Sequence, residues 1–194
     1  MTHQFDISQK NKLDNPERRR TLPPEETLKK LGLKTGEIMA DIGCGIGYFT
    51  FPAGRIVGPG GMVYAMDITD EMLQQVEVGK KHNKLTNIET VKTAEYDLKL
   101  ESGSVSFAFI CNVLHEIEDL GPFIGEIKRI LKDKGRLVVI EWEKQVLQRI
   151  SGPPLEHRLD KEKLMSRLME YGFKRIDCQH IGDQYYSMIM EKGK

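Results

Sequence analysis

Short apolar runs alternate with amphipathic segments along most of the chain, and no other sequence feature restricts the fold as much. Five runs have the length of buried strands, at residues 38–42, 62–66, 88–91, 105–111 and 137–140. Three of the segments between them have the apolar spacing of helices, at residues 46–57, 69–82 and 122–135. Apolar strands that alternate with helices predict a parallel sheet with helices on both faces.

The C-terminal part departs from this alternation. A last amphipathic helix is expected over residues 160–171, ended by Gly172. Two strand-like runs follow at 173–181 and 185–190, with Gly182-Asp183 as a turn between them. Strands that lie so close together in sequence form a hairpin, so one of them runs antiparallel. The sequence therefore predicts a doubly wound α/β fold with a mostly parallel seven-stranded sheet and an antiparallel C-terminal hairpin.

Composition restricts the class of protein. The chain has 194 residues, which suits one domain, and its 29 basic and 29 acidic residues leave no net charge. This balance argues against a nucleic acid or an anionic membrane surface as partner. The sequence offers no membrane span and no signal core near its start, so we expect a cytoplasmic protein, as a monomer or a homodimer. Its three scattered cysteines give no metal-ligand spacing, and no metal site is predicted.

The stretch DIGCGIG, residues 41–47, lies between the first predicted strand and the first predicted helix. Glycine inside an element costs about 0.5–1 kcal/mol relative to alanine. We therefore interpret Gly43, Gly45 and Gly47 as positions where a ligand approaches the backbone. In a doubly wound sheet, ligands bind at the carboxyl ends of the strands, beside the first amides of the next helix.

Two ligand classes compete for this turn. The dinucleotide pattern G-x-G-x-x-G fails, because Tyr48 stands where the third glycine is needed. Asp41 before the glycines favours a ligand with a positively charged end over a pyrophosphate. Asp67 ends the second strand about twenty residues later, where a carboxylate suits ribose hydroxyls. Nicotinamide and adenosyl enzymes both place an acid there, so Asp67 alone leaves both classes open.

The D-x-G-x-G-x-G pattern, the acidic strand end at Asp67 and Thr93-Ala94-Glu95 after the third strand resemble the class I S-adenosylmethionine-dependent methyltransferases. The resemblance covers roughly residues 37–142, and the closing hairpin agrees with the Rossmann-like fold of that family. It is strongest with small-molecule enzymes, which include the quinone-biosynthesis C-methyltransferases. Three further stretches are similar to some of those relatives: KLDNPERRR, LPPEETLKKLGLKTG and GPP.

The resemblance implies S-adenosyl-L-methionine as cofactor and S-adenosyl-L-homocysteine as product. It implies that Asp41 and the glycine turn hold the methionine end, that Asp67 binds the ribose, and that Asn112 faces the methionine moiety. Thr93 replaces an aspartate that is frequent in the family, so the adenine contact is assigned to Glu95 or to backbone. The implied cofactor-binding residues are Asp41, Gly43, Cys44, Gly45, Gly47, Asp67, Ile68, Met72, Ala94, Glu95 and Asn112.

Two residues that follow the fourth and fifth predicted strands are candidates to contact the methyl acceptor. His115 follows the fourth strand and is a candidate general base, with a surface or structural histidine as the alternative. Trp142 follows the fifth strand and is a candidate substrate wall, with buried packing as the alternative. The turn at residues 152–158 is interpreted as a pocket cap that uses His157 or Arg158, or as a linker.

The leading hypothesis is a methyltransferase acting on a small-molecule acceptor. The chain lacks the Asn/Asp-Pro-Pro-aromatic motif that resembling nucleic-acid methyltransferases use, because Asn112 is followed by Val-Leu-His. The alternatives are an NAD(P)-dependent oxidoreductase and a non-catalytic S-adenosylmethionine-binding protein.

The chain is expected to have two parts. Residues 1–36 are expected to form an N-terminal helical segment and candidate lid, and residues 37–194 the methyltransferase domain. Residues 17–20 are interpreted as a solvated helix face rather than an anion site.

Overall fold

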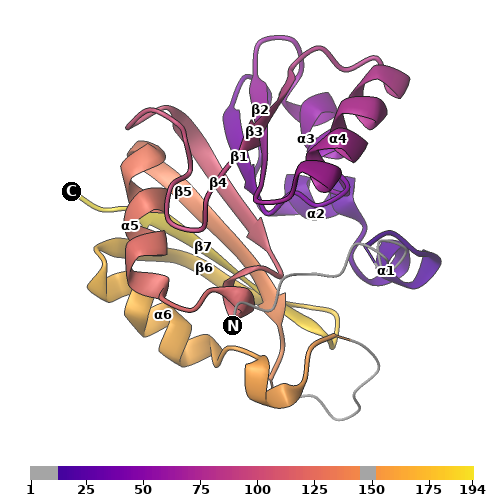
Figure 1. Ribbon diagram of the computed structural model, residues 1–194. Coiled ribbons are helices and arrows are strands. Elements are labelled where there is room, and N and C mark those ends of the chain that lie inside the picture. The colour runs from indigo at the N-terminus through magenta and orange to yellow at the C-terminus, as the bar shows by residue number, and fades with distance from the viewer. Residues whose placement is uncertain (1–12, 145–151) are drawn as a thin grey trace.

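The computed structural model describes residues 13–144 and 152–194. Residues 1–12, the first part of the expected N-terminal segment, and residues 145–151 lie outside this description. The described chain forms one seven-stranded sheet, in the order β3-β2-β1-β4-β5-β7-β6 (Figure 1). The strands are β1 Ile38–Ile42, β2 Met62–Asp67, β3 Ile88–Lys92, β4 Val105–Cys111, β5 Leu131–Trp142, β6 Phe173–Ile181 and β7 Tyr185–Lys192. The α-helices are α1 Pro16–Thr21, α2 Pro24–Lys30, α3 Thr50–Val57, α4 Asp70–His82, α5 Leu120–Ile130 and α6 Lys161–Glu170.

The topology confirms the predicted fold class. Strands β1 to β5 pair in parallel, whereas β7 pairs antiparallel with both β5 and β6. The chain builds outward from β1 to β3 and then returns to place β4 on the other side of β1. Strand order therefore reverses between β1 and β4, which is where such sheets bind ligands.

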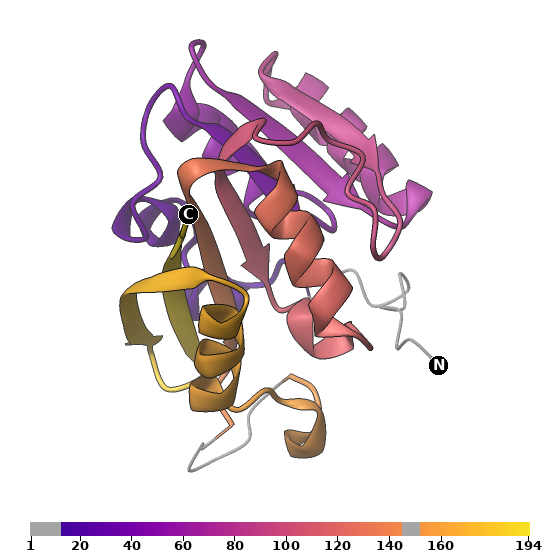
Figure 2. The same ribbon diagram turned by 90° about the vertical axis from the view of Figure 1, so that its left-hand side faces the viewer.

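Helices cover both faces of the sheet, as Figures 1 and 2 show. Helices α5 and α6 pack on one face, and α2, α3 and α4 pack on the other. Strand β4 divides its side chains between the two cores: Phe107 and Phe109 enter one, and Ala108 and Ile110 enter the other. All four are fully buried, and burying a phenylalanine contributes about 1.5–3 kcal/mol. This central strand therefore fixes the position of the residues that follow it.

Local sequence features define the two short helices that precede the sheet. Asn15 caps α1, since its Oδ1 accepts a hydrogen bond from the Arg18 N–H at 2.9 Å. Pro24 begins α2, and Gly32 follows this helix with φ at +88°.

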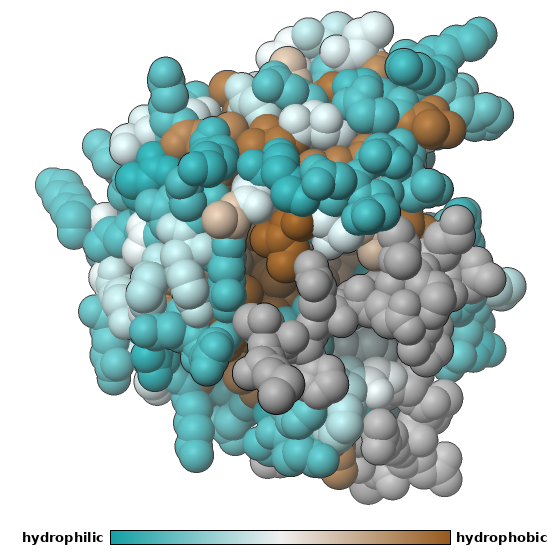
Figure 3. All heavy atoms as spheres, viewed as in Figure 1, coloured by the Kyte–Doolittle hydropathy of each residue, from teal (hydrophilic) through white to brown (hydrophobic). Residues whose placement is uncertain are grey.

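The face of the molecule that Figure 1 presents has a mostly hydrophilic surface. Figure 3 shows a hollow near the centre of this face, where apolar residues are visible. No helix in the described part of the chain combines the length and hydropathy that a membrane span needs.

Two predicted helices have different ends. The helix expected from residue 46 begins at Thr50, because Gly47 takes φ +88° and interrupts the helical path. The helix expected to run from Pro122 to Gly135 begins at Leu120, where Asp119 caps it by accepting the Gly121 N–H at 2.9 Å. It ends at Ile130, because the fully buried Leu131 pairs with Val105 and starts β5 early. Gly135 consequently lies inside a strand.

We expect Gly47→Ala to lower the free energy of unfolding by about 1–3 kcal/mol. A Cβ there would lie 2.7 Å from the Phe51 ring, at a φ that side chains rarely adopt. The matched control is Gly125→Ala in the middle of α5, where a Cβ would meet nothing within 4 Å. That substitution should raise stability by about 0.5–1 kcal/mol. Urea denaturation measures both variants, and equal effects would contradict the argument.

Candidate active site

A cavity of about 1040 Å³ lies at the switch point, beside the carboxyl ends of β1, β2 and β4. It brings together nearly all site residues predicted from the sequence. Those that line it are Asp41, Gly43, Cys44, Gly45, Asp67, Ile68, Met72, Ala94, Glu95, Asn112, His115 and Trp142. Only Gly47 of the predicted set does not line it. The grouping of these residues is a structural fact, whereas their individual roles stay predictions.

The glycines in the turn at residues 41–47, the glycine turn, are needed for two different reasons. Gly43 and Gly47 have φ values of +73° and +88°, and a Cβ on either would overlap Val113 or Phe51. The chain's own packing therefore requires these two. Gly45 has φ +52° and lines the cavity, with Leu13 Cδ1 as the nearest atom to its missing Cβ at 3.3 Å. The interpretation as a place of ligand approach thus fits Gly45 best.

Asp67 holds this turn against the end of β2. Its Oδ2 accepts a hydrogen bond from the Gly45 N–H at 3.0 Å, and its Oδ1 accepts one from the Thr69 N–H at 2.9 Å. Thr69 is the N-cap residue of α4, but its hydroxyl makes no capping hydrogen bond. Burial raises the pKa of Asp67, while these amide hydrogen bonds oppose the rise. The carboxylate is thus held at a strand end, facing the cavity.

Asp41 lies deeper, at the end of β1. It is 3% exposed, and its Oδ2 accepts a hydrogen bond from the Thr50 hydroxyl at 2.6 Å. Burial raises the pKa of Asp41 to about 7, against the lowering effect of the Thr50 hydrogen bond. The first turn of α3 therefore supports the acid at the end of the first strand.

The adenine side predicted from the sequence is built by three segments. Met72 is buried on α4, whereas Ile68 is 44% exposed beside it. Ala94 forms an isolated bridge with Asp97, which shapes the loop after β3. Glu95 Oε1 accepts a hydrogen bond from the Tyr96 hydroxyl at 2.9 Å. This wall mixes apolar contact with polar edges, which suits a flat heterocycle.

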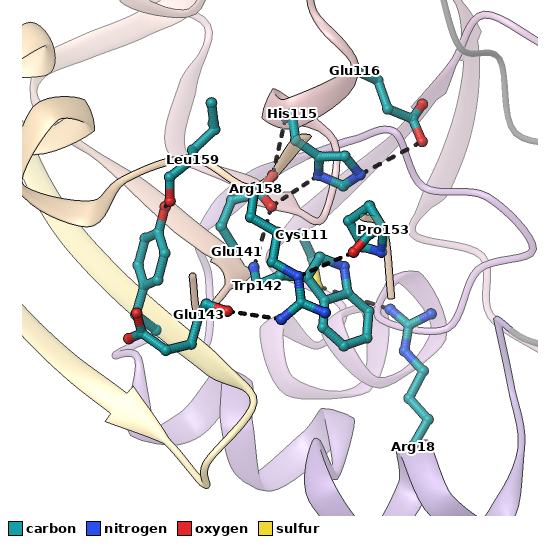
Figure 4. A network of polar contacts seen from close by, with 11 residues as sticks. Arg18, Cys111, His115, Glu116, Glu141, Trp142, Glu143, Pro153, Arg158 and Leu159 are labelled. Carbon is teal, nitrogen blue, oxygen red and sulfur yellow. Dashed lines mark hydrogen bonds and ion pairs between the residues drawn. The ribbon is translucent and has the colours of Figure 1, made fainter. Parts of the chain in front are cut away.

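His115, which lines the cavity, forms a hydrogen-bonded pair with Glu141 (Figure 4). His115 lies in the 3-10 turn Leu114–Glu116 after β4, and its Nδ1 is 2.9 Å from Oε2 of the fully buried Glu141. Burial lowers the pKa of His115, but the hydrogen bond and charge of Glu141 outweigh this and raise it overall. A carboxylate only accepts, so Nδ1 carries the proton and Nε2 is the basic nitrogen of the neutral ring.

Besides Glu141, sequence reasoning missed Glu116 and Arg18 in this region. Glu116 lines the cavity, its Oε1 lies 3.9 Å from His115 Nε2, and burial raises its pKa to about 7. Arg18 also lines the cavity, with its guanidinium 4.6 Å from the centre of the Tyr48 ring. The interpretation of residues 17–20 as a solvated face is therefore wrong for Arg18. The sequence PERRR carries no signal that separates it from its exposed neighbours Arg19 and Arg20.

The turn around Gly152 packs on Trp142. A Cβ on Gly152 would lie 2.7 Å from the indole, and the Trp142 and Tyr185 ring centres are 4.5 Å apart. Arg158 stabilises this arrangement, since its Nη1 donates to the Glu143 carbonyl at 2.8 Å and its guanidinium lies over the indole. Trp142 and His157 line the cavity, whereas Arg158 supports the wall from behind. The turn therefore borders the cavity rather than only linking two elements.

Comparison with known proteins decides the family. A family model described as "Methyltransferase domain" matches residues 40–139. This chain belongs to that methyltransferase family. The class I S-adenosylmethionine-dependent methyltransferase predicted from the sequence is thus confirmed, and the oxidoreductase alternative is not favoured.

Relatives of this methyltransferase include quinone-biosynthesis enzymes. It is 34% identical over 116 residues to the demethylmenaquinone methyltransferase of Lactococcus lactis, which covers 60% of this chain and 46% of that protein. It is 34% identical over 122 residues to a ubiquinone/menaquinone biosynthesis C-methyltransferase of Hahella chejuensis, covering 61% of this chain and 48% of that protein. The chain therefore spans about half the length of these curated relatives.

A solved structure matches the methyltransferase over nearly its whole length. A SAM-dependent methyltransferase of Aquifex aeolicus superposes with a TM-score of 0.91 at 30% identity, covering 97% of this chain and all of that one. The N-terminal helices and the C-terminal hairpin are therefore inside the shared architecture and not additions to it.

We expect the ligand-free protein to lose stability as pH rises from about 5 to 8. The pKa values of Asp41 and Glu116 rise from 3.8 and 4.5 to about 7 in the folded protein, so the folded state binds more protons than the unfolded state in this range. His115, whose pKa is also raised, acts in the same direction. The raised pKa of Asp41 alone lowers the free energy of unfolding by at most about 4 kcal/mol over this pH range. Denaturation at several pH values should show a flatter profile for Asp41→Asn, and stability that rises with pH would contradict this assignment.

Proposed function

We propose that this methyltransferase uses S-adenosyl-L-methionine to methylate a small aromatic acceptor with an acidic hydroxyl group, such as a quinol. The observation that carries the proposal is that one cavity is lined both by Asp67 with the glycine turn and by His115, whose Nδ1 is paired with Glu141. The quinone-biosynthesis relatives support the acceptor class, and the aromatic side chains of Trp142 and Tyr185 offer it a flat wall.

The described residues fit the cofactor. Asp67 keeps lone pairs for sugar hydroxyls beyond the two amides it already binds. Asn112 has φ +59°, and its Oδ1 is buried without a hydrogen-bond partner. An orphaned buried acceptor is costly and indicates a missing donor, which the ammonium group of the methionine tail supplies. Asp41, the least exposed carboxyl group among the residues that line the cavity, lies near the end of the neighbouring strand β1.

In the bound state, the sulfonium of the cofactor supplies an activated methyl group. The protein then needs to align the acceptor and exclude water. Trp142, Tyr185 and the turn at Gly152 enclose the acceptor end of the cavity. They hold the reacting atom in place without taking part in bond making.

His115 is the proposed general base. Glu141 fixes the ring by accepting from Nδ1, and it also accepts the His115 and Trp142 backbone N–H groups at 3.4 and 3.3 Å. Nε2 then removes the proton that the acceptor hydroxyl loses during transfer. Glu116 beside Nε2 is placed to pass this proton toward solvent, since its pKa is raised to about 7. Glu141 acts through the histidine and is a positioning residue.

We expect His115→Gln to lower kcat by about 10²- to 10⁴-fold with S-adenosylhomocysteine affinity unchanged. Glu141→Gln should lower kcat less and move the acid limb of the kcat–pH profile to lower pH, because the charge that raises the His115 pKa is gone. An acceptor screen with quinols and phenols provides the assay. A pH profile that does not move in Glu141→Gln would contradict the positioning role.

We expect Asp67→Ala to weaken S-adenosylhomocysteine binding by about 10- to 100-fold, since two charge-assisted contacts to the ribose are lost. The control is Asp70→Ala on α4, whose carboxylate pairs with Lys92 at the surface. Calorimetry should show wild-type affinity for the control. Binding of NAD in place of S-adenosylhomocysteine would restore the oxidoreductase alternative, and binding without turnover would favour a non-catalytic protein.

Three finer expectations belong to this proposal. The absence of a suitable span among the described helices is consistent with a cytoplasmic enzyme. A monomer or a homodimer is proposed. The described part of the segment 1–36 is proposed to cover the cofactor, because Leu13 and Arg18 line the cavity.

A further inference from the structure

Arg18 is a cation that the described chain leaves without an acidic partner. Its Nη1 donates to the Leu13 carbonyl at 3.0 Å, and its Nη2 lies 3.8 Å from Cys111 Sγ. Among the described residues that line the cavity it is the only arginine or lysine, and it makes no ion pair with them. Its Nε is buried without a hydrogen-bond partner. An arginine stays charged, so this buried donor indicates a missing anionic acceptor.

The position of Arg18 identifies where that anion lies. Leu13, which binds the guanidinium, also borders the missing Cβ of Gly45 in the glycine turn. Cys111, on the other side, directly precedes Asn112, whose buried Oδ1 lacks a donor. A donor and an acceptor that are both buried without a hydrogen-bond partner therefore belong to residues that line the same cavity. Together they are complementary to a zwitterion, which offers a carboxylate to Arg18 and an ammonium group to Asn112.

We propose that Arg18 binds the carboxylate of the amino-acid tail of the nucleoside ligand, with Asn112 receiving the ammonium group. This rests on the proposed function and adds a residue from outside the strand-end motifs. The guanidinium already lies over the Tyr48 ring and donates to the Leu13 carbonyl, so little side-chain freedom remains to be lost on binding. The same carboxylate chemistry on the acceptor is the competing source, and the experiment below separates the two.

The proposal gives helix α1 a role. None of the residues of α1 is buried, so the helix has little apolar contact with the domain. Three residues of α1 line the cavity, Glu17, Arg18 and Thr21, and of these Arg18 reaches Tyr48 and Cys111. A carboxylate bound by Arg18 therefore stabilises α1 on the domain, whereas a ligand without this group does not. Binding of the tail and ordering of α1 are linked.

The test compares two ligands that share the nucleoside thioether. S-adenosylhomocysteine carries the amino-acid tail, and 5′-methylthioadenosine lacks it. Calorimetry should show that Arg18→Met weakens S-adenosylhomocysteine binding by about 10- to 100-fold and changes 5′-methylthioadenosine binding by less than about twofold. The control is Arg20→Met, an exposed arginine of the same helix. Retained 5′-methylthioadenosine binding also shows that the variant is folded.

Hydrogen exchange provides a second readout on the same proteins. S-adenosylhomocysteine should protect the helical amides of Arg19 and Leu22 in the wild type, and 5′-methylthioadenosine should not. Arg18→Met should lose this difference, and Arg20→Met should keep it.

The outcomes separate the hypotheses. Equal effects of Arg18→Met on the two nucleosides would overturn the inference and leave the proposed function standing. Arg18→Met could instead leave S-adenosylhomocysteine affinity unchanged and weaken the binding of benzoate to the complex with S-adenosylhomocysteine. Arg18 would then bind a carboxylate of the acceptor, and the tail assignment would be overturned. A wild-type protein that binds neither nucleoside would contradict the proposed function, and the inference would fall with it.

Discussion

Burial of acidic groups around one cavity is the constraint on which the rest of the site depends. Asp41, Asp67 and Glu116 each have a pKa raised by burial, and Glu141 is fully inaccessible. Buried carboxyl groups need hydrogen-bond donors, and each nearby element supplies some. Amides of the glycine turn and of α4 serve Asp67, a hydroxyl of α3 serves Asp41, and His115 serves Glu141. The positions of the helices relative to the sheet are thereby coupled to the chemistry of the cavity.

Much of the fold is predictable because its signals are local. The strands Ile38–Ile42 and Val105–Cys111 begin and end where the apolar runs do, since both faces of a central parallel strand are covered. The strand order then brings the carboxyl ends of β1, β2 and β4 to one edge, which is why Asp41, Asp67 and Asn112 line the same cavity. The ends of α5 could not be predicted in the same way. Its last turn gives way to β5 because Leu131 is buried against Val105, a contact between distant parts of the chain.

Two of the residues that sequence reasoning missed at the site share one property. Arg18 and Glu141 acquire their roles from partners far away in sequence, Tyr48 and His115 respectively. In the sequence, Arg18 is one of three consecutive arginines, and Glu141 is one of two glutamates around Trp142. Residue type and spacing cannot tell which member of such a group points inward. Only the packed structure separates the exposed charge from the buried one.

The most direct test of the account is a crystal structure of the protein with S-adenosylhomocysteine. The account predicts the ribose hydroxyls within hydrogen-bond distance of the Asp67 carboxylate, the amino-acid tail beside Gly45, and the sulfur directed toward the end of the cavity that contains His115. A nucleoside bound elsewhere on the molecule, or one whose ribose makes no contact with Asp67, would contradict it.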